Sequence, residues 1–149
     1  YLDETSLVDN GSVPVNERLE TGVTGIFAAG DIADVGNGTQ RVRVEHWVAA
    51  QRQGQHAARS MLGADQALGY APFFWTMQYE TPFVFIGYAP DYEDVRYRGD
   101  VVTGDFLAGY FKGGALAAVA TMGKIGEAIA FGRKLDRSER IAPADFEGA

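Results

Sequence analysis

The N-terminal part of the chain carries short apolar runs separated by polar stretches. Residues 11–15 (Gly-Ser-Val-Pro-Val) predict a brief or edge strand, because Pro14 cannot donate a backbone hydrogen bond. Residues 25–30 (Gly-Ile-Phe-Ala-Ala-Gly) predict a strand buried on both faces, since the run is short and apolar throughout. Residues 35–40 are polar and predict a loop. Asp31 therefore falls at a predicted strand end, where open α/β sheets place their ligands.

Residues 45–62 show the periodicity of a helix. Mostly small residues recur on one face, namely Ala50, Gly54, Ala57 or Ala58, and Met61. Such a stripe lets a helix lie close to a sheet, and Gly63 is suited to end the helix in the left-handed conformation. The helix start near residues 45–48 (Glu-His-Trp-Val) would offer N–H groups and a positive dipole end to an anionic or carbonyl ligand.

The C-terminal part predicts strands followed by a helix. Four β-prone runs separated by Pro, Gly and Asp lie at residues 83–88, 94–98, 106–111 and 115–122. Lys112-Gly113-Gly114 predicts a hairpin turn between the last two runs. Residues 126–135 predict a helix, and the residues expected to face the sheet are Ile125, Ala128, Ile129 and Leu135. An antiparallel sheet covered by a helix is an α+β arrangement.

Aromatic residues gather after residue 70, which indicates a domain boundary between residues 63 and 71. We therefore predict two domains, residues 1–67 and 68–149.

Composition narrows the class of protein. The 149 residues are 46% hydrophobic and 22% charged, as in soluble globular proteins, and no apolar run approaches the roughly 18 residues of a membrane helix. The net charge of -7 argues against nucleic-acid binding. The chain contains no cysteine, so it has neither a disulfide nor a thiol redox centre, and its first residues do not resemble a secretory signal. A cytoplasmic location is the expectation.

The candidate chemistry centres on Asp31. An ionised carboxylate accepts strong hydrogen bonds, so Asp31 is suited to bind a sugar or sugar-alcohol hydroxyl. The alternative is that Asp31 only caps the following turn. His46 and His56 share no helix face with a third ligand, so we predict no metal site and treat both as surface or helix-start histidines.

Two segments together resemble a known flavin motif. Residues 24–31 (Thr-Gly-Ile-Phe-Ala-Ala-Gly-Asp), followed by residues 44–54 (Val-Glu-His-Trp-Val-Ala-Ala-Gln-Arg-Gln-Gly), are similar in order and spacing to the second flavin-binding motif of the pyridine-nucleotide oxidoreductases. The resemblance implies that Asp31 binds the ribityl chain and that the helix start meets the pyrimidine side of the isoalloxazine. The implied cofactor-binding residues here are Gly30, Asp31, Glu45, His46, Trp47 and Val48.

Residues 71–79 (Ala-Pro-Phe-Phe-Trp-Thr-Met-Gln-Tyr) resemble the segment that opens the C-terminal domain of ferredoxin reductases and apoptosis-inducing-factor-like reductases. Ile86-Gly87-Tyr88, Asp94-Val95 and Gly99-Asp100 resemble further elements of that domain. The resemblance implies that Trp75 lies beside the flavin edge and the docking surface for the electron acceptor. Judged by residue type alone, Trp75 could equally be a core residue of the sheet.

The resemblance implies a function for the parent protein. It would be an FAD-dependent NAD(P)H oxidoreductase that passes electrons to an iron-sulfur protein of the ferredoxin or Rieske type, and no residue of this chain need act as an acid or base. The implied fold is the C-terminal piece of a flavin-binding α/β domain followed by a small antiparallel-sheet and helix domain. Whether the protein forms a homo-oligomer is left open.

Two features depart from the family pattern. Met77 stands where putidaredoxin-reductase-like members usually carry Asp, which leaves the protein partner open. The sequence contains no Gly-x-Gly-x-x-Gly, so the loops for the FAD pyrophosphate and for NAD are absent from it. Those loops precede this region in the family, and we therefore expect a C-terminal fragment that binds FAD weakly by itself.

Two other functions remain as alternatives. A disulfide reductase has a similar flavin motif, but its C-terminal domain usually supplies a His-Pro pair, and this sequence has no histidine after His56. A non-catalytic interaction or assembly module would explain the missing glycine loops.

Overall fold

The computed structural model describes residues 8–37 and 40–148, which form two compact units. We call residues 1–69 the N-terminal unit and residues 70–149 the C-terminal unit.

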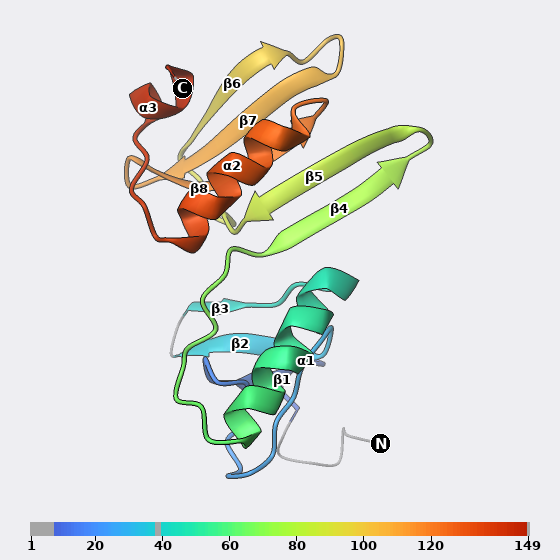
Figure 1. Ribbon diagram of the computed structural model, residues 1–149, viewed down its shortest axis with the longest axis vertical. Coiled ribbons are helices and arrows are strands. Elements are labelled where there is room, and N and C mark those ends of the chain that lie inside the picture. Colours follow the sequence, from blue (N-terminus) through green and yellow to red (C-terminus); the bar gives the residue numbers. More distant parts are fainter. Residues whose placement is uncertain (1–7, 38–39, 149) are drawn as a thin grey trace. The chain divides into compact units, whose positions relative to one another are not determined.

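The N-terminal unit combines a small sheet with one long helix (Figure 1). Its elements are β1 (Val13–Val15), β2 (Ala33–Asn37), β3 (Gln40–Val42) and α1 (Trp47–Met61). β2 lies in the middle of the sheet, parallel to β1 and antiparallel to β3. The buried apolar cluster consists of Val13, Val15, Leu19, Ala33 and Ala57. None of these core residues is aromatic.

The predicted buried strand at residues 25–30 is wrong. The structure has a loop there, and Ile26 is 42% exposed. The loop folds back on the preceding residues, since the Thr21 N–H donates to the Ile26 carbonyl oxygen at 2.8 Å. Positive φ angles of 81° at Gly25 and 86° at Gly30 turn the chain out of an extended path. Asp31 therefore lies in a turn that leads into β2, and not at the end of a strand.

The predicted loop at residues 35–40 is also wrong, because this segment contributes to β2 and β3; residues 38 and 39 lie outside the described residues. The Arg41 side chain links all three strands, which helps to explain why so polar a segment forms a sheet. Arg41 on β3 pairs through Nε with the Asp34 carboxylate on β2 at 2.8 Å. Its terminal nitrogen donates to the Val15 carbonyl oxygen on β1 at 3.2 Å.

The buried face of α1 differs from the predicted stripe. Ala57 is buried as predicted, but Gly54 and Met61 are exposed. Gln53 and His56 are buried in their place, so the prediction of a surface position for His56 is wrong.

Both buried polar residues of α1 bond to backbone groups. Gln53 Oε1 accepts from the Gly30 N–H at 2.7 Å, and His56 Nε2 bonds to the Glu17 carbonyl oxygen at 3.2 Å. A polar side chain can be buried at small cost when it is bonded in this way. Apolar periodicity alone could not reveal this face.

The C-terminal unit is a five-stranded antiparallel sheet with helices (Figure 1). Its strands are β4 (Phe73–Gln78), β5 (Thr81–Gly87), β6 (Asp94–Asp100), β7 (Asp105–Lys112) and β8 (Ala115–Met122), arranged in the order β4-β5-β8-β7-β6. The helices are α2 (Ile125–Asp136) and α3 (Pro143–Glu147), and α2 packs on one face of the sheet. The core consists of Val84, Ile86, Leu107, Phe111, Leu116, Val119, Ala128, Phe131, Ile141 and Phe146.

The α+β fold class is confirmed, and all four predicted strands of this unit are present as β5 to β8. The hairpin is confirmed as well, because Lys112 pairs with Ala115 and the two glycines between them have φ angles of 56° and 66°. Gly63 follows α1 with a φ of 89°, as predicted. β4 and α3 were not predicted. Ile129 is 39% exposed and does not face the sheet; Phe131 and Gly132 are buried on α2 instead.

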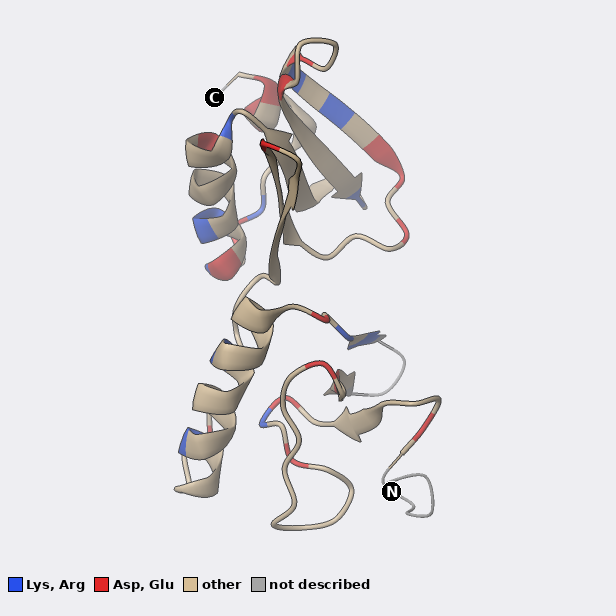
Figure 2. Cartoon of the chain, turned by 90° about the vertical axis from the view of Figure 1, so that its right-hand side faces the viewer, with Lys and Arg blue, Asp and Glu red and all other residues tan. Residues whose placement is uncertain are grey.

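The two faces of this sheet differ in chemistry. On the helix-covered face, β6 carries charged residues at alternate positions (Figure 2), and Arg98 pairs with Glu127 of α2 at 3.1 Å. On the other face, Tyr110 contacts Phe85 and Tyr92 with ring centroids 5.6 and 5.2 Å apart. Burial raises the pKa of Tyr110 above its ordinary value, and nearby Tyr97 and Tyr92 add to the shift.

None of the helices in the described part of the chain is both long and apolar enough to cross a membrane.

Candidate functional site

Asp31 is exposed in a tight turn whose backbone is fixed by hydrogen bonds. The Ala33 N–H donates to the Gly30 carbonyl oxygen at 2.9 Å and so closes the turn. The Gly30 N–H donates to Gln53 Oε1 at 2.7 Å. A Cβ at Gly30 would lie 3.5 Å from the Ala50 Cβ, which is ordinary contact, so the φ of 86° is what favours glycine here. The alternative interpretation made Asp31 the cap of a following turn, whereas the structure places Asp31 inside the turn from Gly30 to Ala33. The ligand-binding role of Asp31 stays a prediction.

Arg43 connects Asp31 with the segment that precedes α1. Its Nε donates to the Asp31 carbonyl oxygen at 2.8 Å, and one terminal nitrogen pairs with Glu45 Oε1 at 2.9 Å. The other donates to the Gly11 carbonyl oxygen at 3.4 Å. Two candidate residues far apart in sequence, Asp31 and Glu45, are thus joined through one guanidinium group. Sequence reasoning missed Arg43, because a bond to a backbone carbonyl leaves no sequence pattern.

The start of α1 is capped by His46. His46 Nδ1 accepts a hydrogen bond from the Val48 N–H at 3.3 Å, so a neutral imidazole carries its proton on Nε2. This bond uses one of the N–H groups that a helix start otherwise offers to a ligand. The first turn of the helix contains no acidic residue that would offset its positive dipole end, and Trp47 beside the cap is 61% exposed.

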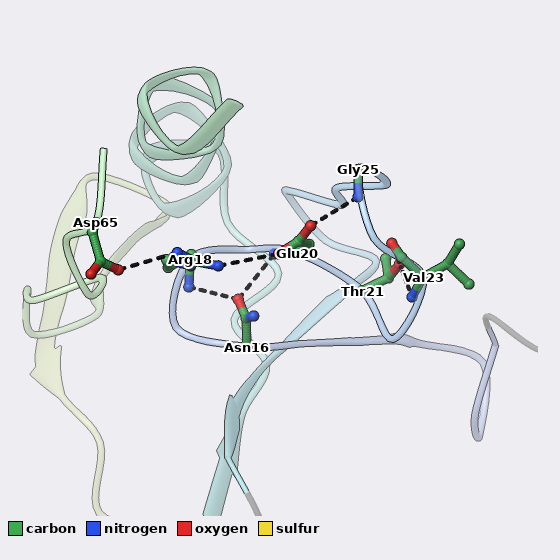
Figure 3. Close-up of polar contacts among 7 residues, drawn as sticks. All are labelled: Asn16, Arg18, Glu20, Thr21, Val23, Gly25 and Asp65. Carbon is green, nitrogen blue, oxygen red and sulfur yellow. Dashed lines mark hydrogen bonds and ion pairs between the residues drawn. The ribbon is translucent and has the colours of Figure 1, made fainter. Parts of the chain in front are cut away.

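A network of polar contacts fixes the loop that leads to the Asp31 turn (Figure 3). Asn16 Oδ1 accepts from the N–H groups of Arg18 and Glu20 at 2.8 and 3.1 Å. The Glu20 carboxylate accepts from the Gly25 N–H at 2.8 Å. Arg18 pairs with Glu20 at 3.4 Å and with Asp65 at 3.1 Å, so residues after α1 also contribute. Polar contacts therefore hold much of the backbone before the turn.

Trp75 belongs to the C-terminal unit. It lies on β4 opposite Val84, and β4 is an edge strand of the sheet. Trp75 is 38% exposed, so it is not a fully buried core residue. Neighbouring Phe74 and Met77 are 36% and 50% exposed, which makes this edge both apolar and accessible.

The residues of the N-terminal unit fit part of an FAD site. An exposed carboxylate on a fixed turn is an acceptor for ribityl hydroxyl groups. The start of α1 is suited to a carbonyl or a partial negative charge, as on the pyrimidine side of a flavin. No group of three or more His, Asp or Glu within residues 8–37 and 40–148 is placed to hold a metal ion.

Comparison with known families assigns each part of the chain. Residues 73–147 match the family model described as "Reductase C-terminal". Residues 3–54 match the model of pyridine nucleotide-disulphide oxidoreductases.

Individual relatives agree with these assignments. Apoptosis-inducing factor 3 of Homo sapiens is 33% identical over 142 residues, which cover 89% of this chain and 24% of that protein. The ferredoxin–NAD(+) reductase component of the anthranilate 1,2-dioxygenase system of Burkholderia cepacia is 32% identical over 130 residues, covering 86% of this chain and 32% of that protein. The chain thus spans about a quarter to a third of the length of these relatives.

A solved structure shows the same fold. The covalent complex of putidaredoxin reductase with putidaredoxin contains a chain that superposes with a TM-score of 0.79 at 28% identity. The match covers 92% of this chain and 33% of that one. The chain belongs to the pyridine nucleotide-disulphide oxidoreductases of the ferredoxin-reductase and apoptosis-inducing-factor type, and it carries the reductase C-terminal domain of that family.

Proposed function

We propose that the protein carrying this chain is an FAD-dependent NAD(P)H oxidoreductase that delivers electrons to an iron-sulfur protein of the ferredoxin or Rieske type. The observation that carries the proposal is the fixed Asp31 turn linked through Arg43 to the start of α1. Relatives support it: one is named as a ferredoxin–NAD(+) reductase component, and another was solved in a covalent complex with putidaredoxin.

FAD held at this site would supply the redox chemistry, namely hydride acceptance from a nicotinamide and single-electron release. The chain's own residues bind and orient it. Asp31 would accept hydrogen bonds from ribityl hydroxyl groups, and the fixed turn around Gly30 would hold its carboxylate in place for them. The segment from Glu45 to Val48, which contains the cap and the first turn of α1, would favour negative charge on the pyrimidine side of the flavin through the helix dipole. No residue of this chain transfers a proton in this proposal.

Trp75 contributes to the partner surface in this proposal. Its indole is partly exposed on an edge strand, and large aromatic side chains of this kind are frequent hot spots of protein interfaces.

The first test replaces Asp31 in the full-length flavoprotein. Asp31→Ala removes the acceptor, and we expect FAD to bind at least about tenfold more weakly, since hydrogen bonds to a charged acceptor contribute roughly 1.5–3 kcal/mol. Asp31→Asn keeps one acceptor oxygen and should lose less. Asp91→Ala, in the C-terminal unit and with a side chain 79% exposed, is the control. Flavin content and affinity unchanged in Asp31→Ala would argue against the ribityl role.

The second test concerns Trp75 in the same protein. Trp75→Ala should slow reduction of the iron-sulfur partner while sparing reduction of a small dye such as ferricyanide. Phe74→Ala on the same strand is the control, because adjacent strand residues point to opposite faces of the sheet. Equal loss of both activities in Trp75→Ala would contradict a docking role. Failure of NADH to bleach any bound flavin in the unmodified protein would favour a non-catalytic module.

A further inference from the structure

Gln53 is a buried polar residue that touches the backbone of the Asp31 turn. It lies on the inner face of α1 and is only 4% exposed. Its Oε1 accepts a hydrogen bond from the Gly30 N–H at 2.7 Å, between residues 23 positions apart in sequence. A buried amide without a partner would destabilise the fold, so this bond fixes both the side chain and the turn.

The turn is held on its other side by Arg43. Gln53 accepts a hydrogen bond from the Gly30 N–H, and Arg43 Nε donates one to the Asp31 carbonyl oxygen at 2.8 Å. The two bonds act on both ends of the Gly30–Asp31 dipeptide. One comes from α1 and the other from the segment between β3 and α1.

The geometry gives Gln53 a role beyond packing. Gly30 has a φ of 86°, and a glycine in this region readily adopts other conformations when its N–H is released. A change of its backbone angles would displace the Asp31 carboxylate, and a displacement of about 1 Å is enough to weaken a polar contact with a ligand. An apolar residue at position 53 could not accept the Gly30 N–H and so would not hold the turn.

We propose that Gln53 is a positioning residue that sets the affinity for FAD by holding Asp31 in place through the Gly30 N–H. The inference rests on the proposed function, because it assumes that Asp31 binds the ribityl chain. The role proposed for Gln53 acts through the Gly30 N–H and requires no contact with the cofactor.

The test is a double-mutant cycle on FAD affinity in the full-length flavoprotein. Gln53→Met removes the acceptor at similar volume, and we expect the dissociation constant of FAD to rise roughly three- to tenfold, as for loss of one neutral hydrogen bond. Gln55→Met is the matched control, since Gln55 lies on the exposed side of the same helix. Combined with Asp31→Ala, Gln53→Met should weaken binding no further.

A second measurement does not depend on the cofactor. In the apoprotein, the Gly30 amide should exchange its hydrogen faster in Gln53→Met than in Gln55→Met, because its acceptor is gone. Gln53→Glu retains an acceptor oxygen and should restore slow exchange and most of the affinity for FAD. This variant keeps the proposal testable if Gln53→Met folds poorly.

The outcomes separate the two proposals. If Asp31→Ala leaves FAD affinity unchanged, the ribityl role itself is wrong. If Asp31→Ala weakens binding but Gln53→Met does not exceed its control, the positioning role is wrong and the proposed function stands. If the double variant weakens FAD binding by the product of the two single-variant factors, Gln53 acts independently of Asp31 and the inference is overturned.

Discussion

The two units of this protein are stabilised in different ways. In the C-terminal unit, the described core contains three phenylalanines, and Phe146 contacts Phe111 and Phe131 with ring centroids 5.7 and 5.1 Å apart. In the described part of the N-terminal unit, the fully buried core residues are aliphatic, and Phe27 packs against them from a partly buried position. Much of its backbone is held by polar side chains such as Arg41 and Glu20. One unit depends mainly on apolar packing, and the other on hydrogen bonds to irregular backbone.

The difference corresponds to what each unit is proposed to do. A cofactor site needs backbone groups in unusual conformations, and side-chain hydrogen bonds can hold these where regular ladders cannot. A partner surface on an edge strand needs a rigid sheet behind it, and an aromatic core provides one. Each unit contains one of the two tryptophans, Trp47 and Trp75, so variants that keep a single tryptophan report the unfolding of each unit separately.

The largest expected effect is in the aromatic core. Phe146→Ala should lower the free energy of unfolding of the C-terminal unit by about 3–5 kcal/mol, because it removes a fully buried ring and leaves a cavity. Denaturant titration followed by Trp75 fluorescence measures this loss. The unfolding midpoint reported by Trp47 fluorescence should not change. Phe74→Ala, at 36% exposure, is the control. Equal shifts of both tryptophan transitions would contradict independent stabilisation of the units.

A smaller effect is expected in the N-terminal unit. Leu19 is fully buried although its φ is 65°, a conformation that leucine rarely adopts. Leu19→Ala should cost about 2–3 kcal/mol, at the lower end for core leucines because the surrounding core is small. The Trp47 transition should shift and the Trp75 transition should not. Leu62→Ala, at 89% exposure, provides the comparison, and a loss there as large as at Leu19 would mean that burial does not govern this unit.

The smallest effect concerns pH and the aromatic face of the sheet. Burial raises the pKa of Tyr110 above its ordinary value of 10.0, so the folded state holds the phenol proton more tightly than the unfolded state. The stability that the raised pKa contributes to the folded state is complete below about pH 10 and is lost as the pH rises through the folded pKa. Tyr110→Phe should therefore make the unfolding free energy of the C-terminal unit fall less steeply above pH 10. Tyr79→Phe, at 99% exposure, is the control substitution. If the unfolding free energy falls equally steeply above pH 10 in Tyr110→Phe and in the unmodified chain, the expectation is wrong.

The sequence predicted the C-terminal unit better than the N-terminal unit, and the same contrast explains why. Each of the strands β5 to β8 pairs with at least one strand adjacent in sequence, and their β-prone residues determine where they form. β4 could have been predicted on the same grounds, because Phe73 to Met77 is a continuous β-prone run. In the N-terminal unit, residues 25–30 look like a buried strand, but glycine conformations and bonds to earlier residues decide otherwise.

The candidate site shows the same limit. Asp31 and the helix start at Glu45 were found through a motif whose order and spacing are specific. Arg43 and Gln53 were not found, because each acts on a backbone group distant in sequence and has no apolar periodicity to mark it. The prediction that remains untested is the role of each site residue toward FAD.

The charged side chains of β6 make this edge of the sheet a poor template for another strand. β6 is an edge of the sheet, and its side chains include Asp94, Arg96 and Arg98, each engaged in an ion pair. If a strand of a second chain paired with β6, its side chains would lie against these charges. Gly99, with a φ of 83°, also bends β6 away from a regular strand edge. Pairing of a further strand with this edge of the sheet is therefore disfavoured.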